Sequence, residues 1–139
     1  MGAASEFYSV YDLDMVKNDS GVYVFYGDLD DLVLLYIGTS KDLRRRIFSH
    51  LSGNSNTGSI YHLFAFVEIF YGANVIDEEQ ALKNCKPLFN TNGVVHYLSH
   101  SENNDRRNKR KELLSKHTDK SLTIHERKLH HLKEQYYNY

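Results

Sequence analysis

Two short runs of strand-forming residues, followed directly by an arginine-rich helical pattern, constrain the fold of this chain most. The runs are Gly21–Tyr26 and Val33–Gly38, both dominated by β-branched, aromatic and aliphatic residues. The segment between them, Gly27–Asp31, is acidic and has the composition of a turn. We therefore predict a β-hairpin. Because side chains alternate along a strand, one face receives Val22, Val24 and Tyr26 and the other receives Gly21, Tyr23 and Phe25.

A helix is predicted directly after the second strand. Thr39–Ser40 offers an N-cap, and Asp42 suits a first helical turn. Apolar residues then recur at intervals of four and give the helix one buried stripe, which consists of Leu43, Ile47 and Leu51. Arg46 and His50 are also four apart and share another face of this helix. The hairpin and the helix thus gather tyrosines, an arginine and a histidine in one short segment.

The middle of the chain predicts a third strand and a further helix. Residues 59–71 are ambiguous, because their start fits a short helix whereas Ala65–Phe70 fits a strand. After a glycine-containing break, a helix is expected from Val75 or Ile76 to about Asn84.

The two ends of the chain are less regular. Residues 5–19 are weakly patterned, and we expect only a short amphipathic turn there. Beyond residue 94 the chain becomes polar and basic. We expect one helix from Asn103 onward and a second after Asp119, with a capping box formed by Thr123 and Glu126. The thin apolar seam of the second helix consists of Leu122, Leu129, Leu132 and Tyr136.

These elements predict an α+β fold, with a small, three-stranded, mainly antiparallel sheet flanked by helices. A length of 139 residues suits one small domain with an appended helical part. We place the compact domain at residues 1–95 and a basic helical extension at residues 96–139.

Charge is distributed unevenly along the chain, although the formal net charge is only −1. Residues 1–40 hold one lysine against seven acidic residues, whereas residues 101–139 hold ten basic against six acidic residues. A polyanion would therefore meet the second half of the chain. On charge alone, the alternative that the basic segment is an ordinary solvated helix stays open.

The cysteine count and the pattern of apolar residues bear on the cellular location of the protein. The single cysteine, Cys85, excludes an internal disulfide framework and a cysteine-based zinc site. No apolar run approaches the roughly 20 residues that cross a bilayer, and the N-terminus lacks the pattern of a signal peptide. We expect a cytoplasmic protein that has no membrane partner.

Several polar residues recur at a spacing that is typical of one family. In order, they are Gly21-Val22-Tyr23, Tyr36-Ile37-Gly38, Arg46 ten positions after the second tyrosine, His50, Glu78, Pro87, and Asn90 twelve positions after the glutamate. With this set the chain resembles the GIY-YIG nucleases over roughly residues 20–93. It departs from the family pattern at Val22, which stands in place of isoleucine. The segment between Arg46 and Glu78 is also short.

The resemblance implies a metal-dependent DNA endonuclease. Phosphodiester hydrolysis needs a deprotonated water, stabilisation of charge on the phosphate and protonation of the leaving oxygen, and one divalent cation can assist. Glu78 would be the ligand of Mg²⁺ or Mn²⁺, because Mg²⁺ prefers oxygen ligands and keeps several waters. Arg46 would stabilise the developing negative charge. The plainer alternatives are that Glu78 is a solvent-facing carboxylate on a helix and that Arg46 is an ordinary surface arginine.

The resemblance also implies roles for the other polar residues. Tyr23 would be the general base or the phenol that orients the water. As a base it would need neighbouring cations that favour its phenolate, because a phenol with a pKa near 10 is otherwise a poor base. Tyr36 would share the same hydrogen-bond network. His50 would support the site or bind phosphate, and Asn90 would brace the site or a metal-bound water. The alternatives are core aromatics and a turn-forming asparagine.

DNA, in its double-stranded form, is the partner that the resemblance implies. The candidate phosphate contacts are Lys41, Arg44 and Arg45 beside the site, and Arg106, Arg107, Lys109, Arg110 and Lys111 in the basic extension. Two other hypotheses remain: a catalytically inactive DNA-binding module, and an interaction domain that forms a homodimer through the seam between Leu122 and Tyr136.

Overall fold

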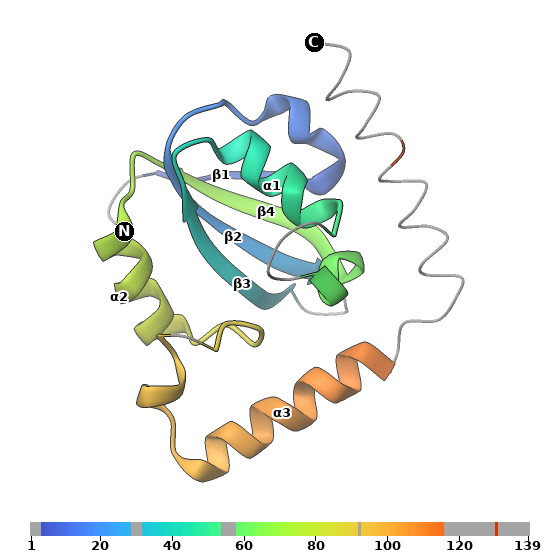
Figure 1. Cartoon of the computed structure of the whole chain (residues 1–139), viewed down its shortest axis with the longest axis vertical. Coiled ribbons are helices and arrows are strands. Elements are labelled where there is room, and N and C mark those ends of the chain that lie inside the picture. Colours follow the sequence, from blue (N-terminus) through green and yellow to red (C-terminus); the bar gives the residue numbers. More distant parts are fainter. Residues whose placement is uncertain (1–3, 29–31, 54–57, 92, 116–129, 131–139) are drawn as a thin grey trace.

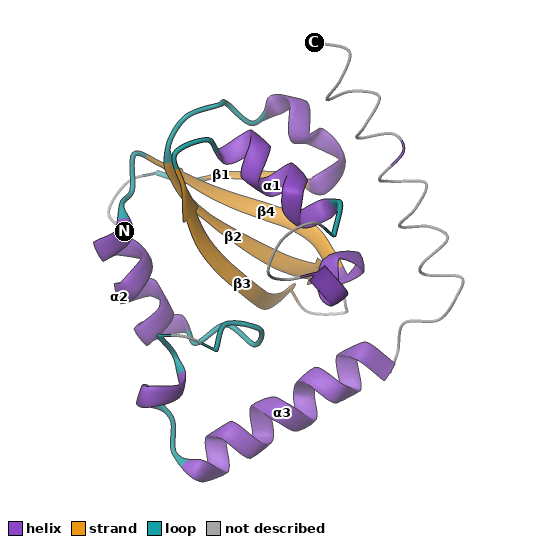
Figure 2. Ribbon diagram, in the orientation of Figure 1, coloured by secondary structure: helices purple, strands orange, loops and turns teal. Residues whose placement is uncertain are grey.

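The computed structural model describes residues 4–28, 32–53, 58–91, 93–115 and 130. In this part of the chain, four strands form one antiparallel sheet in the order β1-β4-β2-β3 (Figure 1). The strands are β1 (Glu6–Ser9), β2 (Gly21–Asp28), β3 (Leu32–Ser40) and β4 (Phe64–Tyr71). The helices are α1 (Leu43–Leu51), α2 (Val75–Cys85) and α3 (His100–Ser115), and the short 3-10 helices are η1 (Val10–Met15), η2 (Gly58–Leu63) and η3 (Val95–Tyr97) (Figure 2). The predicted α+β class is confirmed.

Strand β2 is the central element, because it pairs with β3 on one side and with β4 on the other. The predicted hairpin is confirmed, and Tyr23 of β2 lies opposite Gly38 of β3. The predicted alternation is confirmed as well. Tyr23 and Phe25 enter the core on one face of the sheet, whereas Val22 and Val24 enter a separate core on the other face.

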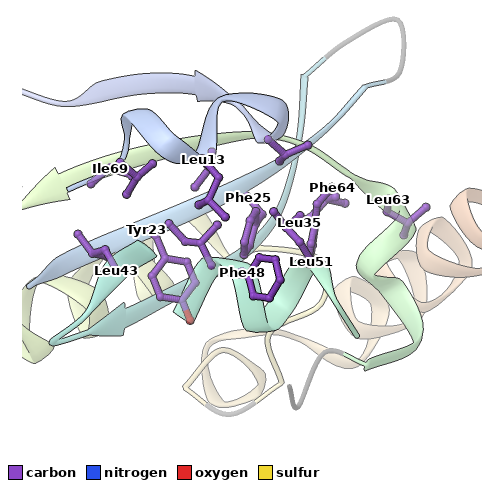
Figure 3. Packing of buried hydrophobic residues seen from close by; sticks show 14 of the residues in the cluster. Leu13, Tyr23, Phe25, Leu35, Leu43, Phe48, Leu51, Leu63, Phe64 and Ile69 are labelled. Carbon is purple, nitrogen blue, oxygen red and sulfur yellow. The ribbon is translucent and has the colours of Figure 1, made fainter. Parts of the chain in front are cut away.

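The larger core lies between the sheet and α1 (Figure 3). The predicted stripe of Leu43, Ile47 and Leu51 is fully buried, each side chain being 0 % exposed. Burying a side chain of this size stabilises the fold by about 1.5–3 kcal/mol. Helix α1 is therefore held firmly against β2, and it carries Arg46 and His50 with it.

Helix α2 covers the opposite face, where Ala81 and Leu82 pack against Ile37 and its neighbours. Its first turn is fixed by a capping box, in which Asn74 and Asp77 exchange hydrogen bonds between side chain and backbone. The predicted start and end of this helix are confirmed to within one residue. Two helices on opposite faces thus approach the same pair of strands, β2 and β3.

The sheet has one strand more than the three that the sequence predicts. Residues 6–9 form β1, which pairs with Phe66–Ile69 of β4, and only the following residues form the expected short helical turn, η1. The short run Glu6–Ser9 has little strand pattern of its own. It is ordered by pairing with an available strand edge and by the burial of Val10 and Leu13 directly after it.

Helix α1 begins slightly later than predicted. Thr39 and Ser40 still belong to β3, and the N-cap is Asp42, whose carboxylate accepts a hydrogen bond from the Arg45 N–H at 3.3 Å. The Ser40 hydroxyl in turn accepts from the Asp42 N–H at 3.0 Å. The chain therefore passes from strand to helix through a tight, hydrogen-bonded turn.

Helix α3 forms the predicted basic helix and begins a few residues earlier than predicted, at His100. Ser99 and Glu102 exchange hydrogen bonds at its start. Leu113, near its end, is 2 % exposed and belongs to the larger core. The helix predicted after Asp119, its capping box and its apolar seam lie outside the described residues. Among the described helices, none combines the length and apolarity needed to cross a bilayer.

Candidate active site

The two tyrosines of the motifs lie on the same face of the sheet. Tyr23 is the register partner of Gly38, and Tyr36 precedes Gly38 by two residues, so both side chains point the same way. A Cβ atom on Gly38 would collide with the ring and the hydroxyl of Tyr23. The glycine of the second motif is thus needed to seat the tyrosine of the first.

Gly21, the glycine of the first motif, is required for a different reason. A Cβ atom there would lie 2.5 Å from the carbonyl oxygen of Phe70 in β4. Only glycine allows β4 to approach β2 so closely at this point. The Gly21 carbonyl also accepts a hydrogen bond from the Thr39 hydroxyl at 3.0 Å, which closes the hairpin at the end where the site lies.

Helix α1 presents two polar groups to the Tyr23 hydroxyl. Nε2 of His50 lies 2.6 Å from this oxygen, and Nε of Arg46, one turn earlier, donates to it at 3.4 Å. Tyr23 is 1 % exposed and His50 is 0 % exposed. The predicted neighbours Arg46 and His50 therefore meet the first tyrosine in a desolvated setting.

Burial sets the protonation of this pair. Burial, with a further contribution from the Arg46 charge, lowers the pKa of His50 to about 3, so its imidazole is neutral at pH 7. Burial also raises the pKa of Tyr23 above its ordinary value, while the Arg46 hydrogen bond and charge lower it by less. Burial thus favours the neutral phenol of Tyr23 over the phenolate, because desolvation outweighs the nearby cation.

Tyr36 completes a group of three rings. Its ring centroid lies 5.2 Å from that of His50 and 6.5 Å from that of Tyr23. Tyr36 is half-buried, and its phenol raises the pKa of Tyr23. Strands β2 and β3 and helix α1 therefore bring both motif tyrosines to one place.

Glu78 lies on α2, within electrostatic range of Tyr23. Its side chain is half-buried, and its charge raises the pKa of Tyr23, although it contributes less than burial, Arg46 and Tyr36 do. Burial, followed by the charge of Glu79, raises the pKa of Glu78 itself. Glu79 is exposed. Of the two neighbouring carboxylates, Glu78 is thus the one whose charge acts on Tyr23.

Glu78 is the residue of this region that could hold a divalent cation together with waters. Glu78 carries a carboxylate whose negative charge is disfavoured by partial burial, and a cation beside it would relieve that cost. Mg²⁺ is commonly held by one or two carboxylates and several waters. The residues that the structure describes contain no group of three or more histidine, cysteine, aspartate or glutamate side chains that could form a closed metal cage.

Asn90 lies beside the second motif and bonds to its backbone. Its Oδ1 accepts from the Ile37 N–H at 2.9 Å, and its Nδ2 donates to the Ile37 carbonyl at 3.0 Å. Asn90 is 7 % exposed. Both ends of its amide thus hold the residue between Tyr36 and Gly38. This geometry matches the bracing role among the two roles considered for Asn90.

The basic residues beside the site divide into two groups. Arg44 turns away from the site and donates to the carbonyl oxygens of Val16, at 2.6 Å, and Asp14, at 3.3 Å. By contrast, Lys41 and Arg45 are exposed and line an open pocket of about 380 Å³. The lining consists of Ser40, Lys41, Asp42, Arg45, Arg46 and Ser49. Because Arg46 belongs to both, this pocket adjoins the group around Tyr23.

The basic residues of α3 also point in different directions. Arg106 and Arg110 are half-buried and donate to carbonyl oxygens of the segment that precedes η3. The exposed members are Arg107, Lys109 and Lys111. The basic residues of α3 therefore lie on two different faces of the helix, one packed against the domain and one exposed.

Sequence reasoning did not identify Ser40 and Ser49 as part of the site. Ser49 lies four residues after Arg45 on α1, and Ser40 directly precedes Lys41. A search for polar residues one helical turn from the basic ones would have found Ser49, whereas Ser40 belongs to β3 and gives no such signal.

Comparison with known families bears directly on this arrangement. Residues 19–86 match the GIY-YIG catalytic domain. The match contains Tyr23, Tyr36, Arg46, His50 and Glu78, whereas Asn90 lies just beyond it. None of the curated proteins compared with the chain matches it. The segment from residue 19 to residue 86, just under half of the chain, is thus similar to a GIY-YIG catalytic domain.

Proposed function

We propose that this chain is a metal-dependent DNA endonuclease that hydrolyses phosphodiester bonds with one divalent cation. GIY-YIG domains are generally those of endonucleases. The observation that carries the proposal is the hydrogen-bonded group of buried Tyr23, buried His50 and half-buried Arg46. Burying polar groups costs free energy, and apolar side chains would serve a purely structural core better. Such a group is therefore best explained by chemistry.

The Tyr23–His50 hydrogen bond suggests how a water could be positioned for attack. The Tyr23 oxygen, held by His50 and Arg46, would accept a hydrogen bond from the attacking water and orient it toward phosphorus, and the proton of the water would pass to solvent. A neutral phenol can orient a water in this way, so the raised pKa of Tyr23 is no obstacle. The neutral His50 imidazole would hold the Tyr23 hydroxyl in place and take up no proton, because the pKa of His50 is only about 3.

Arg46 and Glu78 would stabilise charge on the phosphate. The Arg46 guanidinium is already beside Tyr23, so a phosphate attacked from that side meets a permanent positive charge. A divalent cation held by Glu78 would supply further stabilisation of the phosphate and of the leaving oxygen. Asn90 keeps the backbone of the second motif in place beneath Tyr36.

The pocket beside Arg46 supports the choice of nucleic acid as substrate. It is lined by Lys41, Arg45 and Arg46 against one carboxylate, Asp42, and two serine hydroxyls contribute hydrogen-bond capacity. A phosphate next to the scissile one fits such a lining. Exposed basic residues of α3 would add phosphate contacts along a duplex. Contacts of this kind give affinity without sequence choice, and they weaken steeply with salt.

Cleavage of a supercoiled plasmid tests the proposal. With Mg²⁺ or Mn²⁺ the chain should give nicked or linear DNA, and EDTA should stop the reaction. We expect Glu78→Gln and Arg46→Ala to lower the rate constant at least about 100-fold, as losses of charge stabilisation commonly do. Glu79→Gln and Arg107→Ala are the matched controls and should retain catalysis.

Two results would contradict the proposal and point to the other hypotheses. DNA that is bound but left intact with both metals, under varied pH and salt, would indicate an inactive DNA-binding module. A folded chain that neither binds nor cuts DNA would favour an interaction domain, and sedimentation would then test for a dimer. Mapping of the cut sites on supercoiled, linear and branched DNA would define the preferred form.

A further inference from the structure

The segment that carries Asn90 lies along the edge of β3 as a hydrogen-bonded turn. The Leu88 N–H donates to the Leu34 carbonyl at 3.3 Å, and the Phe89 N–H donates to the Leu35 carbonyl at 2.9 Å. The Asn90 side chain continues these contacts at Ile37. We call residues 87–90 the edge segment. The N–H groups of Leu88 and Phe89 thus bond to the sheet.

The carbonyl groups of the edge segment are used on its other side, by α3. Arg106 donates through Nη2 to the carbonyl oxygens of Pro87 and of Asn90, the latter at 3.2 Å. Arg110, one turn later, donates through Nη1 to the Leu88 carbonyl at 3.0 Å. Hydrogen bonds from a charged donor are stronger than neutral ones. The edge segment is therefore held between β3 and α3, as the loop below β3 in Figure 2 illustrates.

The burial of individual α3 residues agrees with this role. Arg106 and Arg110 are half-buried, and burial, with the charge of Arg110, lowers the pKa of Arg106. Leu113, about one turn after Arg110, is buried in the larger core and anchors the end of the helix. Arg107 lies on the exposed side. A helix that only bound phosphate would gain nothing by directing two arginines inward to carbonyl groups.

We propose that Arg106 and Arg110 are positioning residues of the active site. By holding the edge segment they keep Asn90 on the backbone of Ile37, and Ile37 lies between Tyr36, which contacts the Tyr23 and His50 rings, and Gly38, which Tyr23 crosses. The kinetic part of this inference rests on the proposed nuclease function. The structural part, order at Ile37, does not.

Hydrogen exchange at the Ile37 amide and cleavage kinetics on the full chain together test the proposal. In Arg106→Ala and Arg110→Ala, we expect faster exchange at Ile37, with exchange in the central strand unchanged at Phe25. We also expect the single-turnover rate constant at saturating DNA to fall about 10- to 100-fold, because small misplacements of catalytic groups cost rates of this order. The Kd for DNA should stay within about twofold, since no phosphate contact is removed.

Asn108→Ala is the matched control, and Arg110→Lys is the conservative variant. Asn108 is exposed on the same helix, so Asn108→Ala should leave the Kd, the saturating rate and the Ile37 exchange unchanged. Arg107→Ala should weaken DNA binding and leave the Ile37 exchange unchanged. Arg110→Lys keeps a charged donor and should recover part of the rate and of the protection. It also serves if an alanine variant fails to fold.

The outcomes separate the two proposals. A higher Kd with an unchanged rate and unchanged Ile37 exchange in the Arg106 and Arg110 variants would overturn the positioning role and return these residues to DNA contact. If the unaltered chain cuts no DNA, the nuclease proposal fails. In that case, faster Ile37 exchange in the variants would still show that α3 orders the second motif, and unchanged exchange would refute it.

Discussion

The hydroxyl of Tyr23 lies 2.6 Å from Nε2 of His50, and both side chains are buried. In Tyr23→Phe this nitrogen loses a hydrogen-bond partner inside the core, so we expect the free energy of unfolding to fall by about 1–3 kcal/mol. DNA cleavage should be lost as well. Tyr36→Phe, in a half-buried neighbour, should cost less stability. Urea denaturation and a plasmid assay measure the two effects, and a Tyr23→Phe variant that cuts at the normal rate would refute the proposed role of the Tyr23 hydroxyl.

His50 should make the fold sensitive to mild acid. An unfolded imidazole titrates near pH 6.5, whereas the pKa of folded His50 is about 3. Between these pH values His50 binds a proton in the unfolded state but stays neutral in the folded state. Stability is therefore fully present above pH 6.5 and should fall by about 1.4 kcal/mol per pH unit below it.

The variant His50→Gln isolates this contribution, because glutamine can still accept from Tyr23 but does not titrate. Both proteins share Arg46, Glu78 and Glu79 around the site, so the difference between their denaturation curves at about pH 7, 6 and 5 reports His50 alone. If the free energy of unfolding varied with pH equally in the two proteins, His50 would not be buried in its neutral form.

Gly38→Ala should damage the site through the ring that crosses it. The added methyl group occupies the place of the Tyr23 ring, so the ring must move away from His50. We expect a loss of about 1–3 kcal/mol in stability, as for other overpacked sites, together with loss of cleavage. Gly27→Ala in β2 is the control, since its Cβ would come no closer than 3.3 Å to another atom, a Leu35 methyl carbon. Similar effects of the two variants would speak against the explanation.

Glu78→Gln should remove activity without reducing stability. The pKa of folded Glu78 is raised, so its ionised form opposes folding at neutral pH, and an uncharged isostere removes that cost. Thermal melts of the Gln variant should match or exceed those of the unaltered chain. Mg²⁺ should raise the melting temperature of the unaltered chain only, by mass action on the folded state. A metal-dependent shift that persists in the variant would place the cation elsewhere.

Arg44 and Arg45 are neighbours with opposite expected phenotypes. Arg44→Ala removes two hydrogen bonds to the carbonyls of η1 and its flank, so stability should fall by about 1–3 kcal/mol while DNA binding persists. Arg45→Ala should leave stability unchanged, weaken DNA binding, and reduce the slope of log K against log salt by about one. Denaturation and salt titrations distinguish them, and a reversed pattern would contradict the assignment of the pocket.

Local periodicity was sufficient for much of the fold. The stripe of Leu43, Ile47 and Leu51 and the alternation along β2 are properties of a few consecutive residues, and both are confirmed. Strand β1 could not be predicted in this way, because Glu6–Ser9 becomes a strand only by pairing with distant β4. The cap of α1 was misplaced for a related reason, since Ser40 still has a partner in β2.

The residue set of the candidate site could be chosen from spacing, but its electrostatics could not. Nothing in the residues around Tyr23 tells how deeply the phenol is buried, and burial decides its protonation. Likewise, the basic run of α3 does not reveal that Arg106 faces a loop while Arg107 faces solvent. Such differences depend on tertiary contacts between segments far apart in the chain.

The position of the edge segment has a consequence for association between chains. An open strand edge is a template on which a second molecule can add its own strand, and aggregation often starts there. In the described sheet, β3 is covered from Leu34 to Ile37 by residues 88–90, and the opposite edge is formed by β1, which is only four residues long. The same contacts that order the second motif thereby leave little edge for unwanted β-pairing.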